Sequence, residues 1–460
     1  MSSTTQASKD TIGVILLRGD PKVAIIKLSI PMIVAMLLMS TYNLANAIWV
    51  AGLGSDALAA VGFITPLFMI LIGLGNGLGA GVTSVISRRI GANDHEGANT
   101  AAIQAIGMTV LVSIIISVIL ILTSYPLVLL FGAGETADLA VEYGNIVFAG
   151  TILLLLTNVT YAILRAEGDT KRTMYVMAVS SILNIILDPI LIYYCKLGIA
   201  GAAWGMIISL IMVMIVLLYW FFVKKDTYIR LTWPETKFDR DTIHDILQVG
   251  LPASCEFFLF SFLAIFINGI LVTVAGTDAV AVYTAGWRVV MFAIIPLVAI
   301  GTSVVSVTAA AYGGRQFEKF KVIHSFSILF GMAIAVGISI VTWLFSGPIS
   351  YIFSYSAEGA HLAPSIAAFL ATMCIFYPFV PPGIMSSSVF QGTGKGVTSL
   401  IINILRNLVF MATSAYLLGI TFGFGEHGVW WGIVIGDILG GITGFFWARY
   451  YISKLIQYGR

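Results

Sequence analysis

Long apolar segments almost free of charge dominate this sequence of 460 residues, and they limit its fold more than any other feature. A helix that crosses the hydrocarbon core of a bilayer needs about 20 predominantly apolar residues. Windows of that length lie near 28–51, 60–87, 99–123, 139–163, 172–195, 198–223, 246–274, 280–310, 321–346, 364–389, 396–420 and 428–452. Charged residues make up only 10% of the chain, against about 25% in soluble domains. We therefore predict an all-α integral membrane protein with twelve transmembrane helices.

Lysine and arginine are gathered at alternate ends of these segments. Of the 24 basic residues, 21 lie in the two terminal tails and in the loops 88–98, 164–172, 224–245, 311–321 and 390–396, or within four residues of them. Short basic loops stay on the cytoplasmic side of a membrane. The pattern predicts a multi-pass protein of the cell membrane with both termini in the cytoplasm.

The two halves of the chain resemble each other. The segment I-K-L-S-I-P (26–31) returns as L-Q-V-G-L-P (247–252), and G-S-D-A-L-A (54–59) returns as G-T-D-A-V-A (276–281), each about 222 residues later. Each repeat holds six spans, an even number, so the two repeats are parallel and are related by a pseudo-twofold axis along the membrane normal. The predicted domains are an N-terminal lobe (1–223), a cytoplasmic linker (224–245) and a C-terminal lobe (246–460).

Motifs for catalysis or nucleotide binding do not fit this pattern. The run G-L-G-N-G-L-G-A-G (73–81) lies inside an apolar span, where glycines spaced by four allow close helix packing. The turn G-T-G-K-G (392–396) lacks the Ser or Thr and the first Gly of a phosphate loop. The three cysteines are dispersed, the five histidines form no metal motif, and the net charge is only +2. We expect no enzyme activity, no cofactor, no firmly assigned metal site and no nucleic-acid partner.

Five ionisable residues lie deep inside the predicted spans, more than four residues from either end, where such residues are functional candidates because burying them in a membrane is costly. They are Asp188, Glu256, Arg288, Arg406 and Asp437. Glu256 and Arg406 each lie about ten residues from the cytoplasmic side, and Arg288 and Asp437 each lie about nine residues from the outside. Matched depth makes two structural ion pairs, Glu256 with Arg406 and Asp437 with Arg288, as plausible as a functional role.

Asp188 is the strongest of these candidates. It lies in the outer third of span five, and Asn184 is one helical turn earlier on the same face. Tyr42, Asn43 and Asn46 reach the same depth on span one. We predict that the five residues form a polar cluster that lines a cavity. Asp188 then either carries a coupling ion, or stays protonated and only bonds Asn184 or the carbonyl freed by the following proline.

The order of several motifs resembles the multidrug and toxic compound extrusion (MATE) family, in its prokaryotic DinF-like branch, over about 20–455. The matching segments are S-I-P-M (29–32), Y-N-L-A-N-A-I-W-V-A-G-L-G (42–54), A-L-A-A-V-G (57–62), S-R-R-I-G-A (87–92), I-L-R-A-E-G-D (163–169), N-I-I-L-D-P (184–189) and L-P-A-S-C-E (251–256). The resemblance implies two six-helix lobes arranged as a V. It also implies a secondary antiporter that expels organic cations and other amphiphiles against an inward H⁺ or Na⁺ gradient.

The resemblance also implies roles for single residues. Asp188 matches the cation-coupling aspartate of the family on the fifth helix, and Asn184 and Tyr42 match its neighbours. Glu256 matches a frequent glutamate on the seventh helix, which we assign together with Asn43 to the substrate cavity.

The chain departs from the family pattern at two positions of this site. Asn46 stands where an aspartate is usual, and Met206 stands at a cavity position that is commonly threonine. A site that lacks a carboxylate and a hydroxyl is a poorer oxygen cage for a metal cation. This difference favours H⁺ over Na⁺ as the coupling ion.

The sequence thus predicts a monomeric exporter that exchanges organic cations or amphiphilic drugs for H⁺ or Na⁺ by alternating access. One alternative is a flippase for lipid-linked precursors, which would need cationic grooves for phosphate groups. Only Arg288 and Arg406 supply positive charge deep inside the spans, which argues against that alternative. A membrane scaffold that transports nothing is the other alternative, and the duplicated halves and the buried Asp188 argue against it.

Overall fold

The computed structural model describes residues 10–231, 239–354 and 360–459, and helices make up nearly all of these ranges. The N-terminal lobe contains α1 (Ile12–Arg18), α2 (Pro21–Ala51), α3 (Ser55–Gly91), α4 (His95–Leu130), η1 (Gly134–Thr136), α5 (Ala137–Ala149), α6 (Thr151–Ala166), α7 (Thr170–Pro189), η2 (Ile190–Tyr194), α8 (Gly198–Leu218) and η3 (Tyr219–Lys224). The C-terminal lobe contains α9 (Arg240–Gly313), α10 (Lys319–Leu344), α11 (Ser346–Phe353), η5 (Ala360–Leu362), α12 (Ala363–Phe376), η6 (Tyr377–Phe379), α13 (Val380–Gly392), α14 (Gly396–Ile404), η7 (Leu405–Ala412), α15 (Thr413–Tyr416), η8 (Leu417–Thr421) and α16 (Gly425–Tyr458).

Twelve membrane crossings result from these helices within the described residues. Ten helices and one bent pair, α5 with α6, are long and apolar enough to cross a bilayer. The longest, α9, has 74 residues and is broken at Gly276, where φ is 77° and ψ is −164°. Glycine adopts a positive φ without steric cost, so the chain reverses there and α9 crosses twice. The predicted all-α fold with twelve transmembrane helices is confirmed.

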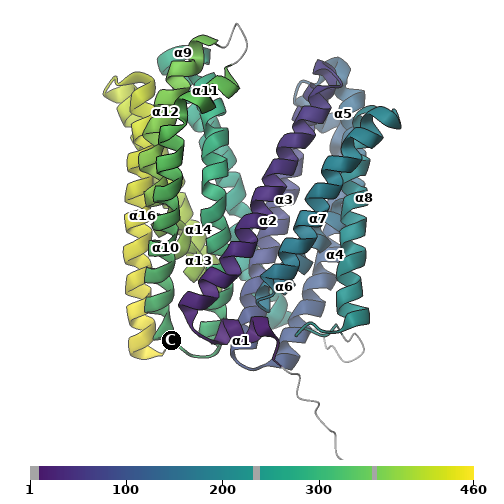
Figure 1. Ribbon diagram of the computed structural model, residues 1–460, viewed down its shortest axis with the longest axis vertical. Helices are drawn as coiled ribbons and strands as arrows, with labels where there is room; N and C mark the ends of the chain where they lie inside the picture. The colour runs from purple at the N-terminus through teal and green to yellow at the C-terminus, as the bar shows by residue number, and fades with distance from the viewer. Residues whose placement is uncertain (1–9, 232–238, 355–359, 460) are drawn as a thin grey trace, which may run out of the picture.

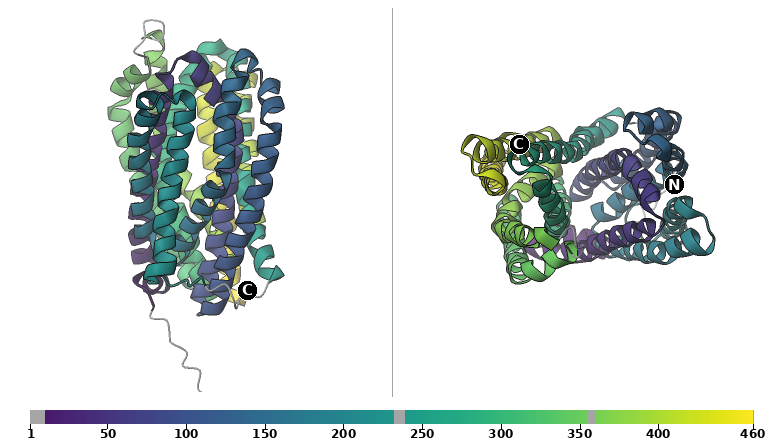
Figure 2. Two further views of the ribbon diagram at one scale, coloured as in Figure 1. Left: turned by 90° about the vertical axis from the view of Figure 1, so that its right-hand side faces the viewer. Right: turned by 90° about the horizontal axis from the view of Figure 1, so that it is seen from above.

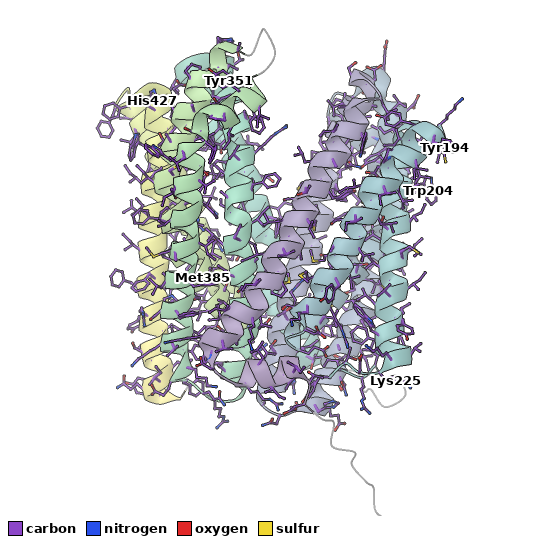
Figure 3. The ribbon with its side chains drawn as sticks, in the orientation of Figure 1. Tyr194, Trp204, Lys225, Tyr351, Met385 and His427 are labelled. Carbon is purple, nitrogen blue, oxygen red and sulfur yellow. The ribbon has the colours of Figure 1, made fainter. Side chains whose placement is uncertain are left out.

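The two lobes form a V (Figure 1). Their ribbons lie close together at the end that carries α1 and the C-terminus, here called the terminal end, and separate toward the opposite end, here called the far end. Seen from above, the helices form two groups that lie side by side (Figure 2). Lys225 lies at the terminal end of the first lobe, whereas Tyr194 and Trp204 lie toward its far end (Figure 3).

Aspartates begin several helices at the terminal end. Asp20 accepts a hydrogen bond from the backbone N–H of Lys22, and Asp94 accepts one from Gly97. Each of these carboxylates satisfies a backbone donor that the first turn of a helix leaves without a partner. The polar loops that contain these aspartates therefore lie at the terminal end, where they lead into the next helix.

Contact between the lobes is made chiefly by α3 against α9, and close backbone approach makes it possible. A Cβ atom on Gly77 would overlap Ser254, and one on Gly81 would overlap the carbonyl of Ile246. The glycine run at 73–81 is thus a packing surface, as its spacing predicts. A salt bridge of 3.3 Å between Arg88 and Asp245 also joins the lobes at the terminal end.

Candidate functional site

Asp188 is buried at the last turn of α7, with an exposed fraction of 0%. Its Oδ2 atom accepts a hydrogen bond of 2.7 Å from the Nδ2 atom of Asn46 on α2. The chain follows with Pro189 and the π-helical turn η2, which starts at Ile190. Such a π-helical turn inside an α-helix is frequent at functional sites. The hydrogen bond from Asn46 thus joins two residues that the sequence places at the same depth in the membrane.

The other carboxylate oxygen of Asp188 has no hydrogen-bond partner among the described residues, although it is buried. Asn184 donates from Nδ2 to the backbone carbonyl of Ser180 at 2.9 Å, and its own Oδ1 atom is likewise buried without a partner. Asn184 and Asp188 are one turn apart and share a face, as predicted, but no hydrogen bond joins them. Two buried acceptor oxygens without donors are costly. A proton or a cation bound at this site would supply the donor or positive charge that these two oxygens call for.

Space for the Asp188 carboxylate is provided by Gly205 on α8, because a Cβ atom there would overlap Oδ1 of Asp188. Trp204, the preceding residue, lies toward the far end of the lobe (Figure 3). Met206, the following residue, is partly buried and packs against the apolar cluster of this part of the lobe. The absence of a side chain at residue 205 is thus a requirement for the present position of the acid.

Two tyrosines lie close enough to Asp188 to interact with it electrostatically, namely Tyr42 from α2 and Tyr143 from α5. Tyr42 is one of the predicted residues. Sequence reasoning missed Tyr143, although its place about four residues inside span four gives it the same depth as the cluster. Asn43 is exposed, and no contact to Asp188 is recorded for it.

A second contact fastens α2 to the helix that carries Asp188. The hydroxyl of Tyr193 in η2 donates a hydrogen bond of 2.5 Å to the backbone carbonyl of Trp49, near the end of α2. The rings of the two residues also meet edge to face, with centroids 6.4 Å apart. This hydrogen bond and this ring contact join η2, directly after Asp188, to the last turn of α2.

Glu256 in the second lobe has neutral hydrogen-bonding neighbours. Its Oε1 atom accepts a hydrogen bond of 2.7 Å from the hydroxyl of Ser399, and both carboxylate oxygens lie 3.4 Å from Nε2 of Gln391. Asn403 follows Ser399 by one turn on α14 and donates to Ser387 at 3.1 Å. This polar group places Glu256 between α9, α13 and α14, and its neutral members were not singled out from the sequence.

The ion pairs suggested by matched depth differ from those in the structure. Arg406 donates from Nε to Oδ1 of Asp437 at 2.5 Å, and the side chains are 6% and 0% exposed. Arg288 is exposed and has no recorded ion pair within the described ranges. The structure therefore pairs Arg406 with Asp437 and not Asp437 with Arg288, and no salt bridge joins Glu256 to Arg406 within the described residues. Arg406 and Asp437 both lie near the middle of their spans. Their depths were counted from opposite sides of the membrane, so the counts did not show that the two residues lie at a similar level.

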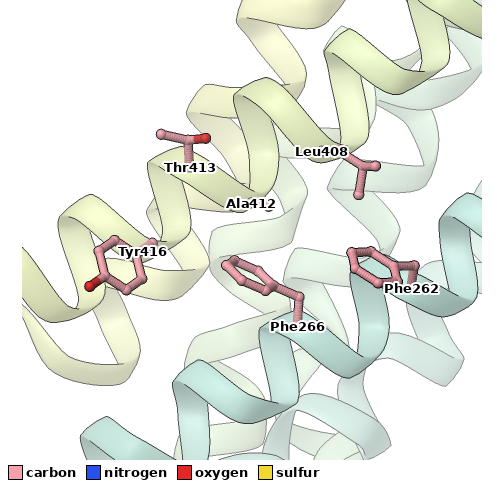
Figure 4. Close-up of a pocket in the computed structure, with 6 residues that line it drawn as sticks. All are labelled: Phe262, Phe266, Leu408, Ala412, Thr413 and Tyr416. Atoms are coloured by element: carbon pink, nitrogen blue, oxygen red, sulfur yellow. The ribbon is translucent and has the colours of Figure 1, made fainter.

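An apolar pocket of about 360 Å³ lies between α9 and the helix Gly396–Thr421. Its lining residues are Phe262, Phe266, Leu408, Ala412, Thr413 and Tyr416, which Figure 4 shows projecting from the two helices. Four of the six are on the helix that contains the π-helical segments η7 and η8. The pocket offers aromatic and aliphatic surface but no charge.

Glu167 holds the start of the predicted linker against the first lobe. It follows α6 at the terminal end, outside the membrane-spanning segments, and its Oε2 atom accepts a hydrogen bond of 3.0 Å from the backbone N–H of Ile229. Burial raises the pKa of Glu167 to about 8, and the backbone hydrogen bond offsets this only in part. Asn99 accepts a further bond of 2.8 Å from the N–H of Arg230.

No group of three or more His, Cys, Asp or Glu side chains suited to a metal ion occurs in the described part of the chain. The two acids of the candidate sites lie in different lobes, Asp188 in the first and Glu256 in the second. The geometry thus supports two separate polar sites, each with one carboxylate whose charge is not neutralised by a direct ion pair.

Comparison with known proteins gives consistent matches over most of the chain. A family model described as MatE matches residues 31–190 and 252–417, one segment in each half. The chain is 26% identical over 444 residues to the probable multidrug resistance protein YoeA of Bacillus subtilis (strain 168), covering 93% of this chain and 94% of that protein. It is 26% identical over 422 residues to the multidrug export protein MepA of Staphylococcus aureus (strain MSSA476), with coverages of 90% and 91%.

Two solved structures show a similar fold at higher identity. One is the outward-facing conformation of a multidrug resistance MATE family transporter of the MOP superfamily; it is 40% identical, covers 98% of this chain and 100% of its own, and gives a TM-score of 0.95. The other is a MOP superfamily transporter from Pyrococcus furiosus Vc1, 41% identical with a TM-score of 0.94, covering 97% of this chain and 99% of its own.

Proposed function

Because the chain belongs to the MATE family of transporters, we propose that it is a secondary multidrug efflux transporter that exchanges cationic or amphiphilic drugs for H⁺. The names of YoeA and MepA support multidrug export as the activity. In this proposal the protein moves its substrates and catalyses no covalent reaction.

We place the terminal end in the cytoplasm and the far end outside. Of the 24 basic residues, 21 lie in the loops and tails of the terminal end or within four residues of them, and basic loops favour the cytoplasmic side. In this orientation the lobes meet at the cytoplasmic side and separate toward the outside. The similarity to an outward-facing transporter structure agrees with this assignment.

The observation that carries the coupling hypothesis is the buried Oδ1 atom of Asp188, which has no hydrogen-bond donor among the described residues. A proton on this oxygen removes the buried negative charge and supplies an O–H donor beside Asn184, whose Oδ1 also lacks a donor. One proton thus neutralises Asp188 and also provides a donor for Asn184. A hard metal cation, in contrast, prefers several oxygen ligands. We therefore assign H⁺ to Asp188.

Exchange requires that the proton and the drug favour different conformations, because a ligand shifts an equilibrium only by its differential affinity. A deprotonated Asp188 favours a cationic drug in the first lobe, and a protonated one does not. Protonation also changes the hydrogen bonding at the last turn of α7, and the bond from Tyr193 to Trp49 passes a shift of this turn to α2. Protonation from the outside then releases the drug.

The test is Asp188→Asn, which imitates the neutral acid, in everted vesicles with an imposed H⁺ or Na⁺ gradient and ethidium as the substrate. We expect a folded protein without gradient-driven ethidium transport. Asp138→Asn, at an exposed aspartate on α5 in the same lobe, is the control and should transport normally. Full H⁺-driven transport by Asp188→Asn would overturn the coupling role, and transport driven only by Na⁺ in the wild type would overturn the choice of ion.

A further inference from the structure

Three helices meet at the terminal end of the second lobe and present basic side chains on its surface. α10 lies there between α16 and the start of α2 (Figure 1). The apolar side chains beneath this surface form one buried cluster, which includes Ile25 of α2, Ile323 of α10 and Ile452 of α16. The start of α2 is therefore packed against the second lobe, and it brings a lysine of its own to this surface.

Arg449 on α16 and Ser325 on α10 join two of these helices. The Nη2 atom of Arg449 donates a hydrogen bond to the hydroxyl of Ser325, which is exposed. Lys321 is one turn before Ser325, so both side chains share the exposed face of α10. Next to them, the ammonium group of Lys22 on α2 lies over the ring of Phe326, 6.0 Å from its centroid. We call Lys22, Lys321, Ser325 and Arg449 the basic patch.

The basic patch has more positive charge than its surroundings neutralise. The salt bridges of the described residues include none of its three cations. In the first lobe, by contrast, Arg89 and Arg172 each form a salt bridge to an aspartate. From residue 314 to residue 459, six basic residues but only one acid, Glu318, lie in the loops and helix ends of the terminal end. Asp20 is also near, but its carboxylate caps α2.

Aromatic rings hold two of the cations of the patch at the membrane surface. The guanidinium group of Arg449 lies over the ring of Phe445, 5.3 Å from its centroid. Lys22 lies over Phe326, whose ring stacks in turn on Phe330 with the centroids 6.0 Å apart. A ring face attracts a cation but leaves its N–H groups free for an anion. Basic pockets between membrane-spanning helices are typical binding sites for anionic lipid headgroups.

α10 continues from the basic patch toward the far end with an apolar stripe. The stripe consists of side chains spaced by seven residues, which lie on one face of a helix. Its members are Val322, Leu329, Val336 and Trp343, all exposed, and Leu329 is 67% exposed. A soluble anion would leave this stripe bare, whereas the acyl chain of a lipid covers it. The combination therefore favours a phospholipid over a soluble anion.

We propose that the basic patch binds the headgroup of an anionic phospholipid, such as phosphatidylglycerol, in the leaflet at the terminal end. Arg449 and the hydroxyl of Ser325 donate hydrogen bonds to the phosphate, and the two lysines add positive charge around it. One acyl chain lies along the apolar stripe of α10. The assignment of this leaflet to the cytoplasmic side rests on the proposed function, but binding of the lipid does not depend on transport.

The size of the effect follows from the charges. One basic residue near an anionic membrane surface changes binding by about fivefold. The double variant Lys321→Gln with Arg449→Gln should therefore bind phosphatidylglycerol about 25-fold more weakly. The matched control is Arg240→Gln with Lys395→Gln, which removes the same charge from the starts of α9 and α14 at the same end. This control should bind the lipid like the wild type.

Native mass spectrometry of the purified full chain measures the bound lipid. Phosphatidylglycerol is titrated against phosphatidylcholine with the same acyl chains, because phosphatidylcholine has the phosphate but no net charge. Melting temperatures show which variants are folded. Lys321→Gln alone tests the proposal if the double variant folds poorly, since Lys321 is exposed and no hydrogen bond is recorded for its side chain within the described residues. This single variant should bind about fivefold more weakly.

A preference of the wild type for phosphatidylglycerol that is lost in the double variant and kept in the control would support the proposal. Equal binding of both lipids by the wild type would overturn it. An equal loss in the control would also overturn it, because the general charge of the terminal end would then explain the binding. Release of the bound phosphatidylglycerol by millimolar inorganic phosphate would show that the patch is a site for a free anion rather than for a lipid.

Discussion

Gly205→Ala should disturb the Asp188 site without removing any of its functional groups. The added Cβ atom would overlap Oδ1 of Asp188, so the carboxylate must move by about 1 Å to regain an ordinary non-bonded contact. A shift of that size acts on the bond of 2.7 Å from Asn46 to Oδ2. The variant therefore keeps the acid but changes its position.

The magnitude follows from what the carboxylate loses. A hydrogen bond to a charged group contributes about 1.5–3 kcal/mol, and an extra methyl group in a packed interior costs about 1–3 kcal/mol. Since about 1.4 kcal/mol corresponds to a factor of ten, we expect gradient-driven transport to fall by roughly ten- to a hundredfold. Global stability should fall by no more than about 3 kcal/mol.

Ethidium transport in everted vesicles measures the effect, with expression and melting temperature recorded beside it. Gly107→Ala on α4 is the matched control, because a Cβ atom there meets no atom within 4 Å. We expect this control to transport and melt like the wild type. Normal transport by Gly205→Ala would show that the position of the Asp188 carboxylate is not important for coupling, and would refute this reasoning.

Three further predictions test the orientation, the linker and the second lobe. Single cysteines introduced as Arg230→Cys and Phe345→Cys, with the three native cysteines replaced, should differ in intact cells: an impermeant thiol reagent should label only position 345, and labelling at 230 would contradict the topology. Glu167→Gln should remove a loss of stability that the wild type shows as pH rises from about 5 to 8, because a pKa near 8 lets the folded protein bind more protons than the unfolded chain in that range. The variant should melt like the wild type at pH 5 and at a higher temperature at pH 8, whereas an equal difference at both pH values would rule out titration of Glu167. Glu256→Gln should fold normally, since Ser399 and Gln391 can still bond an amide; a lower melting temperature with unchanged transport would make Glu256 structural.

The sequence alone determined the twelve helices and their arrangement in two lobes. Membrane-spanning helices satisfy their own backbone hydrogen bonds, so the length and apolarity of each segment are sufficient to locate it. Even the break at Gly276 lies in the repeated motif G-T-D-A-V-A, which corresponds to the loop G-S-D-A-L-A of the first half. These features depend on the local chain and on its duplication, and they need no knowledge of helix neighbours.

The candidate site of the first lobe could be predicted in part for a related reason. Asp188 and Asn46 lie at the same depth on spans one and five, and depth can be counted along the sequence. The bond partner of Asn184 could not be predicted, because its amide bonds the carbonyl of Ser180 within its own helix rather than the nearby acid. Tyr143 has the right depth, but its helix was not known to face the site.

Only the tertiary structure decided which charges of the second lobe meet. Depth is one coordinate, whereas an ion pair depends also on which helices are neighbours and on the direction in which each side chain points. Arg406 reaches Asp437 because Gly383 and Gly440 leave space for its side chain between their helices. Gly205 likewise gives Asp188 its position. In a sequence, a glycine shows only that a side chain is absent at that position. Which side chain of a neighbouring helix fills the space beside the glycine depends on how the helices pack.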